Sequence, residues 1–311
     1  MNRYDDVRLD LARLFKEQEA GLTAWDPRAR SGDPLGLPGH VVSRLRLAVT
    51  AAAYRLGIHQ RLVYSRLKLD WFREFREYWM SVLGLRPLEP DDFTYLLGAY
   101  RQRFQTLDAD GLGVDEAPLG AWQDPRNLYL LLSHHYRTAL RPLGVYRYAP
   151  FVPRRARVCE YGCGVAPLTT RLVRFYPHLD LTITCADLPT VLFHFARWRF
   201  RALPFVRTVI VDPADDAPLE GEFDVVFCTE VLEHVPRPLA LLRHLHARLA
   251  PRGVLIFDYI RSQGRGLDTV GGLHDRLPAL GFVREAFEVV QGSVPVDGTD
   301  VTPVVCRKRG T

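Results

Sequence analysis

The stretch that decides the fold is Arg155–Ala166, which reads RARVCEYGCGVA. Its small apolar residues Val158 and Cys159 are typical of a central strand in a parallel sheet. Gly162 and Gly164 follow the strand, and glycine lets the backbone turn sharply beside a ligand. After the turn, apolar residues recur at the spacing of a helix. A strand, a glycine turn and a helix in this order are typical of a ligand-binding unit in an open α/β sheet.

An acidic residue, Glu160, lies two positions before the first glycine. In a dinucleotide site, where the turn holds phosphates, a carboxylate here would repel the ligand, so the acid favours a cationic ligand. The order acid, any residue, Gly, any residue, Gly resembles the first motif of class I S-adenosylmethionine-dependent methyltransferases, with Ala166 at the third small position. The resemblance implies that Glu160, Gly162 and Gly164 bind S-adenosylmethionine and that S-adenosylhomocysteine is the product.

Further apolar runs alternate with helical patterns along the rest of the chain. They predict strands near residues 181–186, 206–211, 224–228 and 253–258, followed by an antiparallel pair within 282–290 and 301–306. Alternating strands and helices favour a doubly wound sheet with helices on both faces. Together with the resemblance, they predict an α/β fold for residues 125–311, with a seven-stranded, mostly parallel sheet of the class I methyltransferase type.

The region before residue 125 has helical patterns only and shows no internal repeat. We expect residues 1–124 to form an α-helical cap domain for the substrate, with aromatic residues that either line a pocket or pack in a core. A new helix is predicted at Asp124 and Pro125, because Asp is a favoured N-cap and Pro a favoured first helical residue. This junction is the expected boundary with the S-adenosylmethionine-binding domain of residues 125–311.

His135 and Tyr136 lie on the apolar face of the helix expected over residues 125–141. In the family that the chain resembles, the helix before the first strand often covers the methionine end of the cofactor. The resemblance therefore makes His135 and Tyr136 candidate cofactor contacts, and an ordinary core histidine is the alternative.

Acidic residues also follow the second and third predicted strands. Residues at the carboxyl ends of parallel strands face the ligand, and Asp187 is expected there to accept hydrogen bonds from both ribose hydroxyls. The resemblance also implies that an acid shortly after the third strand binds the adenine amine, and Asp215 fits that spacing better than Asp212. Both residues have an alternative role, which is to cap or solubilise a turn.

The fourth predicted strand opens into residues 229–235, which read TEVLEHV. These residues are expected to lie across from the glycine turn, with Thr229 beside the cofactor. Glu230, Glu233 and His234 then flank the transferred methyl group. We favour His234 as a general base, since the ordinary pKa of histidine suits proton removal at neutral pH.

The same three residues resemble a metal-binding pattern of ubiquinone-pathway O-methyltransferases and small-RNA terminal 2′-O-methyltransferases. Two carboxylates and one imidazole suit Mg²⁺ or a transition ion that polarises a hydroxyl group. The string also occurs in class I methyltransferases that use no metal. We therefore predict a site without metal, and the metal-binding set Glu230, Glu233 and His234 is the alternative. A purely structural role of His234 is the third interpretation.

The composition limits the partners that we expect. The 311 residues carry a formal net charge of +5, but the cations are almost all arginine and form no long run, so a polyanion partner is not supported. The five cysteines lack zinc-binding spacing, and no apolar stretch has the shape of a signal peptide or the length of a membrane span. We expect a cytoplasmic protein with no nucleic-acid or membrane partner, and we assign no oligomeric state.

These observations predict an S-adenosylmethionine-dependent methyltransferase that acts on an oxygen or nitrogen of a small-molecule acceptor, for example a natural-product or sugar intermediate. Two alternatives remain, namely methylation of RNA or another macromolecule and a non-catalytic binding protein with the same fold. The intact motif acid and glycines, together with Asp187, argue against the non-catalytic alternative, because a relic is free to lose them.

Overall fold

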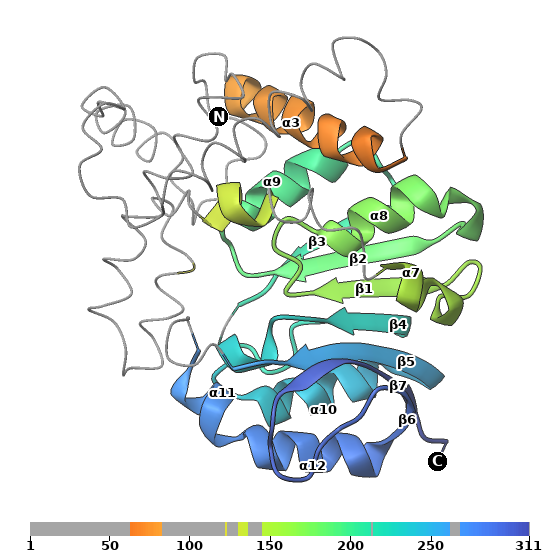
Figure 1. Cartoon of the computed structure of the whole chain (residues 1–311), viewed down its shortest axis with the longest axis vertical. Coiled ribbons are helices and arrows are strands. Elements are labelled where there is room, and N and C mark those ends of the chain that lie inside the picture. Colours follow the sequence, from red (N-terminus) through yellow and green to blue (C-terminus); the bar gives the residue numbers. More distant parts are fainter. Residues whose placement is uncertain are drawn as a thin grey trace. The chain divides into compact units, whose positions relative to one another are not determined.

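The structure is a computed structural model of the chain, and it describes residues 63–82, 122, 130–135, 145–212, 214–261 and 268–310 (Figure 1). The chain divides into two compact units. One unit comprises residues 1–106 and 125–142, and the other comprises residues 107–124 and 143–311. The junction between residues 124 and 125 lies outside the described residues, so the expected domain boundary stays a prediction.

The first unit contains helix α3 (Val63–Ser81), which places three aromatic residues on one buried face. Phe75, Tyr78 and Trp79 follow the i, i+3, i+4 spacing that aligns side chains on one side of a helix. Residues 130–135 are also helical, and the ring of His135 stacks on Phe75 with 5.3 Å between the ring centroids. The aromatic residues at these positions pack in a core, as one of the two interpretations of the sequence expected.

The second unit is built on a seven-stranded sheet. Its strands are β1 (Arg157–Tyr161), β2 (Thr182–Asp187), β3 (Val206–Ile210), β4 (Phe223–Cys228), β5 (Leu249–Tyr259), β6 (Phe287–Gln291) and β7 (Val301–Lys308). They lie in the order β3-β2-β1-β4-β5-β7-β6 (Figure 1). The first five strands are parallel, and β7 runs antiparallel to both β5 and β6. The predicted seven-stranded, mostly parallel sheet with its antiparallel pair is therefore confirmed.

Helices pack on both faces of this sheet. The α-helices are α7 (Val145–Tyr148), α8 (Pro167–Phe175), α9 (Val191–Phe200), α10 (Pro238–Arg248), α11 (Val270–His274) and α12 (Arg276–Ala286), and the 3-10 turns are η2 (Ala149–Phe151), η3 (Pro177–Leu179) and η4 (Leu232–His234). Neighbouring residues of a strand point to opposite faces. Val158 packs in a core with α8 and α9, whereas Cys159 packs in a core with α10 and α12. The doubly wound arrangement is therefore confirmed.

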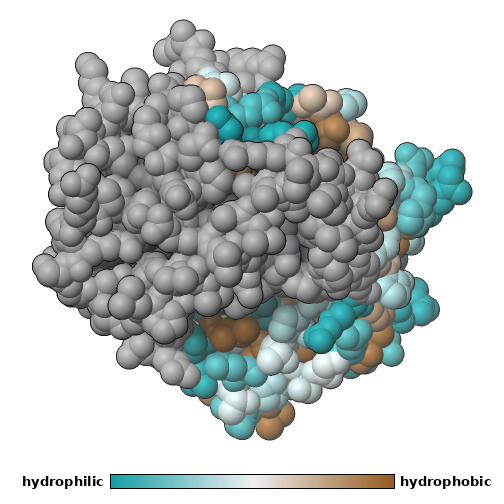
Figure 2. Space-filling model, turned by 45° about the horizontal axis from the view of Figure 1, so that its top comes forward, coloured by the Kyte–Doolittle hydropathy of each residue, from teal (hydrophilic) through white to brown (hydrophobic). Residues whose placement is uncertain are grey.

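The surface of the second unit is mixed in character. In the view of Figure 2, hydrophilic and hydrophobic residues are interspersed over the described surface. Exposed large apolar residues include Val270, Leu273, Leu277 and Val296. Among the helices that the structure describes, none combines the length and the apolar character that a membrane span needs.

The topology decides where a ligand site is expected. The chain runs from β1 outward to β2 and β3, and then returns to place β4 on the other side of β1. The connections that leave β1 and β4 therefore lead to helices on opposite faces of the sheet, α8 after β1 and α10 after β4. Ligands of open α/β sheets bind at this kind of switch point. The glycine turn, Asp187 and residues 229–235 all follow strands that end at this edge.

Candidate functional site

The glycine turn after β1 is held by both neighbouring strands. Gly162 and Gly164 have φ values of +64° and +51°, in the left-handed region that favours glycine. The amide of Gly162 donates to the carbonyl of Ala186 at the end of β2 over 2.8 Å. A Cβ atom on Gly162 would lie 2.3 Å from Cγ2 of Val231, so the turn closes tightly against the segment that leaves β4. Position 162 therefore requires glycine for two reasons, its left-handed backbone and the lack of space for a Cβ atom.

Glu160 is buried and anchors the start of α8. Its Oε1 accepts a hydrogen bond from the amide of Leu168 (3.1 Å), and its Oε2 accepts one from the amide of Thr169 (2.7 Å). A carboxylate at this place satisfies amides that the first turn of a helix leaves without partners. Burial raises the pKa of Glu160 above its ordinary value, and the hydrogen bonds from Thr169 oppose that shift. Direct contact of Glu160 with a cofactor stays a prediction.

Asp187 links the loops that follow β1 and β2. Its Oδ2 accepts from the amide of Gly164 (2.5 Å), and its Oδ1 accepts from the amide of Leu188 (2.6 Å). Burial raises the pKa of Asp187 to about 6, against the opposing effect of these two hydrogen bonds. Each oxygen keeps a second lone pair for another donor. The predicted contact of Asp187 with a ribose is compatible with this arrangement and stays a prediction.

Asp212 and Asp215 cap the turn that follows β3. Oδ1 of Asp212 accepts from the amide of Ala214 (3.0 Å), and Oδ1 of Asp215 accepts from the amide of Ala217 (2.8 Å). Both aspartates are exposed. The structure thus shows the turn-capping role that was the alternative for both residues, and binding of adenine stays a prediction.

The segment after β4 is anchored by an acid that the sequence analysis did not select. Glu230 has a left-handed backbone (φ +57°), and its amide donates to Oδ1 of Asp258 over 2.6 Å. Asp258 is buried near the end of β5, and this burial raises its pKa to about 7. Thr229, directly after β4, is half-buried, whereas Glu230 is exposed. An acid at the end of an apolar run was the available signal for Asp258, the same signal that selected Asp187.

Glu233, which we expected to flank the transferred methyl group, is buried beside His234. Its side chain is 1% exposed, and its Oε2 has no hydrogen-bond partner among the described residues. Burial raises the pKa of Glu233 to about 9, so the group is neutral at neutral pH. Its Oε1 lies 3.8 Å from Nε2 of His234. Glu233 therefore borders the histidine as an uncharged carboxyl group.

His234, at the end of η4, keeps 17% of its side chain exposed. The rings of Trp122 and His234 pack in a T-shaped arrangement, with 5.3 Å between the ring centroids. Its Nδ1 lies 3.6 Å from Oδ1 of Asp268, a residue of the segment between β5 and α11. The ring thus has neighbours on several sides and still reaches solvent. No spacing in the sequence pointed to Trp122 or Asp268.

The described part of the chain contains no group of three or more His, Cys, Asp or Glu side chains that could hold a metal ion. Glu230 is exposed, whereas Glu233 is buried beside His234. The three residues of the metal alternative therefore do not form such a group in the described part of the chain.

His135 lies in the first compact unit, buried against Phe75, and Tyr136 lies outside the described residues. The stacked, buried ring of His135 agrees with the core histidine that was the alternative in the sequence analysis. Contacts of His135 and Tyr136 with a cofactor stay predictions.

A family model described as a methyltransferase domain matches residues 132–291, a stretch that contains β1 to β6. The chain belongs to this methyltransferase family. The glycine turn after β1, Asp187, residues 229–235 and Asp268 fall within the matched methyltransferase domain.

Curated relatives of the methyltransferase domain include two bacterial enzymes. The ubiquinone biosynthesis O-methyltransferase of Xanthomonas campestris pv. campestris is 36% identical over 105 residues, which cover 33% of this chain and 42% of that protein. The enzyme of the same name from Actinobacillus pleuropneumoniae is 33% identical over 166 residues, which cover 50% of this chain and 65% of that protein. The chain therefore matches less than two thirds of the length of either relative.

A solved structure, an O-methyltransferase family protein from Burkholderia thailandensis, is similar with a TM-score of 0.43 and 18% identity and covers 71% of each chain.

Proposed function

We propose that the protein is an S-adenosylmethionine-dependent methyltransferase that methylates an oxygen or nitrogen of a small molecule. The observation that carries the proposal is the turn after β1, where the left-handed Gly162 and Gly164 lie beside the half-buried Asp187. Membership of the methyltransferase family supports the reaction. The names of the curated relatives favour oxygen as the acceptor atom. S-adenosylhomocysteine is then the product.

The cofactor would be held by residues at the carboxyl edge of the sheet. Asp187 has lone pairs left for the ribose, and Glu160 keeps the start of α8 in place behind the turn. Thr229 stands at the end of β4, on the opposite side of the switch point. Roles for Asp212 or Asp215 at the adenine, and for His135 and Tyr136 at the methionine end, belong to the same proposal.

Bound S-adenosylmethionine supplies an electrophilic methyl group. The main task of the protein is to hold the acceptor atom at attack distance, because orientation alone lowers the barrier of such a displacement substantially. His234, which is partly exposed, accepts the proton that the acceptor loses. Glu233 carries its own proton at neutral pH because of its raised pKa, so it does not compete for this proton.

Calorimetric titration with S-adenosylhomocysteine tests the binding part of the proposal. We expect Asp187→Asn to weaken binding by at least about tenfold, because an amide cannot accept from two backbone donors and a ribose together. Glu222→Gln, a change at an exposed residue that pairs with Arg157, is the matched control and should leave the affinity unchanged. Absence of binding heat with folded protein would refute the proposal.

Transfer of a labelled methyl group tests the chemistry. A panel of phenols, alcohols and amines should reveal at least one acceptor. Binding without transfer to any acceptor would favour the non-catalytic alternative. Transfer to bulk RNA that falls steeply with added salt would favour a macromolecular substrate, because contacts with phosphates weaken with salt.

A further inference from the structure

We propose that Asp268 is a positioning residue that fixes the ring orientation and the tautomer of His234. This inference rests on the proposed function in one respect, namely that His234 takes the proton of the acceptor. It adds a residue of the segment between β5 and α11 to the site.

Thr269 fastens this segment to the backbone on both sides of His234. Its amide donates to the carbonyl of Glu233 over 2.9 Å, and its hydroxyl donates to the carbonyl of Val235 over 2.9 Å. The same hydroxyl accepts from the amide of Gly272 over 2.8 Å, which caps α11. The residue before Thr269 is therefore held at a fixed place relative to His234.

Two glycines allow this close approach of the two backbones. A Cβ atom on Gly271 would lie 1.8 Å from the carbonyl oxygen of Pro236, and one on Gly272 would lie 2.2 Å from the carbonyl oxygen of Glu233. Neither glycine has a left-handed φ, so the reason for glycine here is space and not backbone conformation. The start of α11 thus packs directly on the backbone of residues 233–236.

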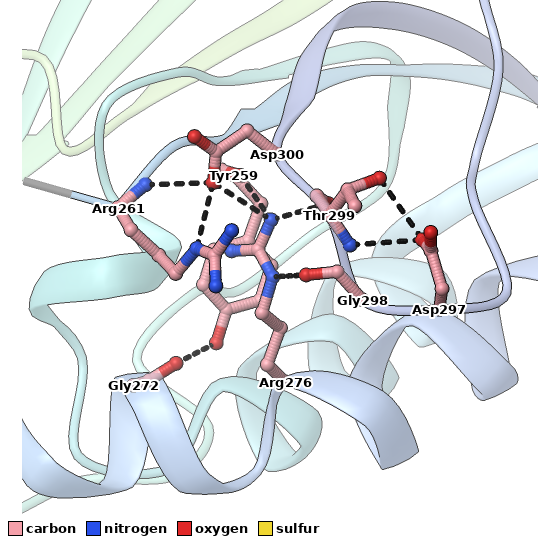
Figure 3. Close-up of polar contacts among 8 residues, drawn as sticks. All are labelled: Tyr259, Arg261, Gly272, Arg276, Asp297, Gly298, Thr299 and Asp300. Carbon is pink, nitrogen blue, oxygen red and sulfur yellow. Dashed lines mark hydrogen bonds and ion pairs between the residues drawn. The ribbon is translucent and has the colours of Figure 1, made fainter. Parts of the chain in front are cut away.

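Tyr259 and Arg276 also anchor this part of the chain, as Figure 3 shows. The hydroxyl of Tyr259 donates to the carbonyl of Gly272. The guanidinium of Arg276 lies 4.3 Å from the centre of the Tyr259 ring and donates to the carbonyls of Tyr259, Gly298 and Thr299, each over 2.7 Å (Figure 3). These contacts tie α11 and α12 to the end of β5, so the segment that carries Asp268 has a rigid base.

This anchoring places the side chain of Asp268 beside the ring of His234. Oδ1 of Asp268 lies 3.6 Å from Nδ1 of His234, and the side chain of Asp268 is only 6% exposed. This distance is slightly longer than a hydrogen bond. Hydrogen bonds of a catalytic histidine are often long before a substrate binds and shorten in the complex.

A carboxyl oxygen beside Nδ1 has a definite chemical effect. It favours the tautomer that carries the proton on Nδ1, which leaves the lone pair of Nε2 free to accept a proton. Glu233 lies on the other side of the ring, with its Oε1 3.8 Å from Nε2. Trp122 packs against the ring in a T-shaped arrangement and limits its rotation.

The first test reads the tautomer itself and does not depend on methyl transfer. Nitrogen-15 spectra of the histidine rings, with His234→Gln to assign the signals, should show Nδ1 protonated in the neutral ring of the wild type. Asp268→Asn should shift the population toward the tautomer protonated on Nε2. Asp275→Asn is the matched control, because Asp275 contacts the exposed His274 over 3.4 Å. An unchanged tautomer of His234 in Asp268→Asn would overturn the proposal.

The second test uses the reaction. Asp268→Asn should lower kcat by at least about tenfold, while the affinity for S-adenosylhomocysteine and the KM of the acceptor stay within about twofold. In a His234→Ala background the same change should have no further effect, because Asp268 acts through the histidine. An equal loss in both backgrounds would show a merely structural role and overturn the inference. A wild type without any turnover would refute the proposed function, and the tautomer would still decide the role of Asp268.

Discussion

Replacing Gly162 by alanine should damage the turn after β1 in two separable ways. Alanine must adopt the left-handed φ of +64°, which costs about 1–2 kcal/mol for a residue with a Cβ atom. The new Cβ atom would also lie 2.3 Å from Cγ2 of Val231, and such overpacking costs about 1–3 kcal/mol. The free energy of unfolding should therefore fall by about 2–5 kcal/mol.

A glycine with similar backbone and open surroundings isolates the first effect. Gly221 has a φ of +85° and no atom within 4 Å of the position of a Cβ atom, so Gly221→Ala should cost only about 1–2 kcal/mol. At Gly164 a Cβ atom would lie 3.5 Å from Cδ2 of Leu192, an ordinary van der Waals contact, so Gly164→Ala should also show the first effect alone. Urea unfolding, followed by fluorescence and circular dichroism, measures the three variants under the same conditions.

The second effect is tested by removing the atoms that clash. In a Val231→Ala background, Gly162→Ala should cost about 1–3 kcal/mol less than in the wild type, which is the coupling energy of a double-mutant cycle. A cost of Gly162→Ala that is equal in both backgrounds would refute the reasoning, because the contact with Val231 would then carry no energy. Calorimetry of the folded double variant with S-adenosylhomocysteine shows whether the geometry of the turn is restored.

Three further predictions follow from the site. Burial raises the pKa of Asp258 to about 7, so between about pH 4 and about pH 7 the folded state keeps a proton on Asp258 that the unfolded state has lost, and stability falls as pH rises through this range. Urea unfolding at several pH values should show a weaker dependence of stability on pH for Asp258→Asn. An unchanged dependence would contradict the assignment. Arg276→Met removes the donor to the three backbone carbonyls of Figure 3 and should lower the free energy of unfolding by about 3 kcal/mol or more. Arg261→Met, at the exposed ion pair with Asp300, should lower it by less than about 1 kcal/mol. Equal losses in the two variants would refute this reasoning. His234→Ala should lower kcat by about 10² to 10⁴-fold and leave the affinity for the cofactor unchanged. EDTA should not change the activity of the wild type. Loss of wild-type activity with EDTA and its return with Mg²⁺ would support the metal alternative.

The sheet was predictable because each of its strands carries a local signal. The signal for β1 is a run of small apolar residues followed by two glycines, and both glycines adopt the positive φ values that a sharp turn needs. The later strands are apolar runs bounded by turn residues, and their alternation with helical patterns gave the doubly wound arrangement. Asp187 was selected by its place at the end of a strand, which the structure confirms.

The contacts that hold the site together were not predictable in the same way. Asp268 and His234 are far apart in the sequence, and their contact depends on how closely Gly271 and Gly272 let two backbones approach. The partners of Arg276 are backbone carbonyls, which every residue has, so no residue pattern marks them. The burial that makes Glu233 neutral is likewise a property of the packed structure and not of the string in which it lies.

The place of β7 has a consequence for the synthesis of the protein. The ribosome releases β7 after the other strands of the sheet, yet β7 lies between β5 and β6. A nascent chain that stops before residue 301 therefore leaves the edges of both neighbours open. Open strand edges pair readily with other chains and promote aggregation. Stalled translation before β7 is complete thus exposes two strand edges that the finished sheet covers.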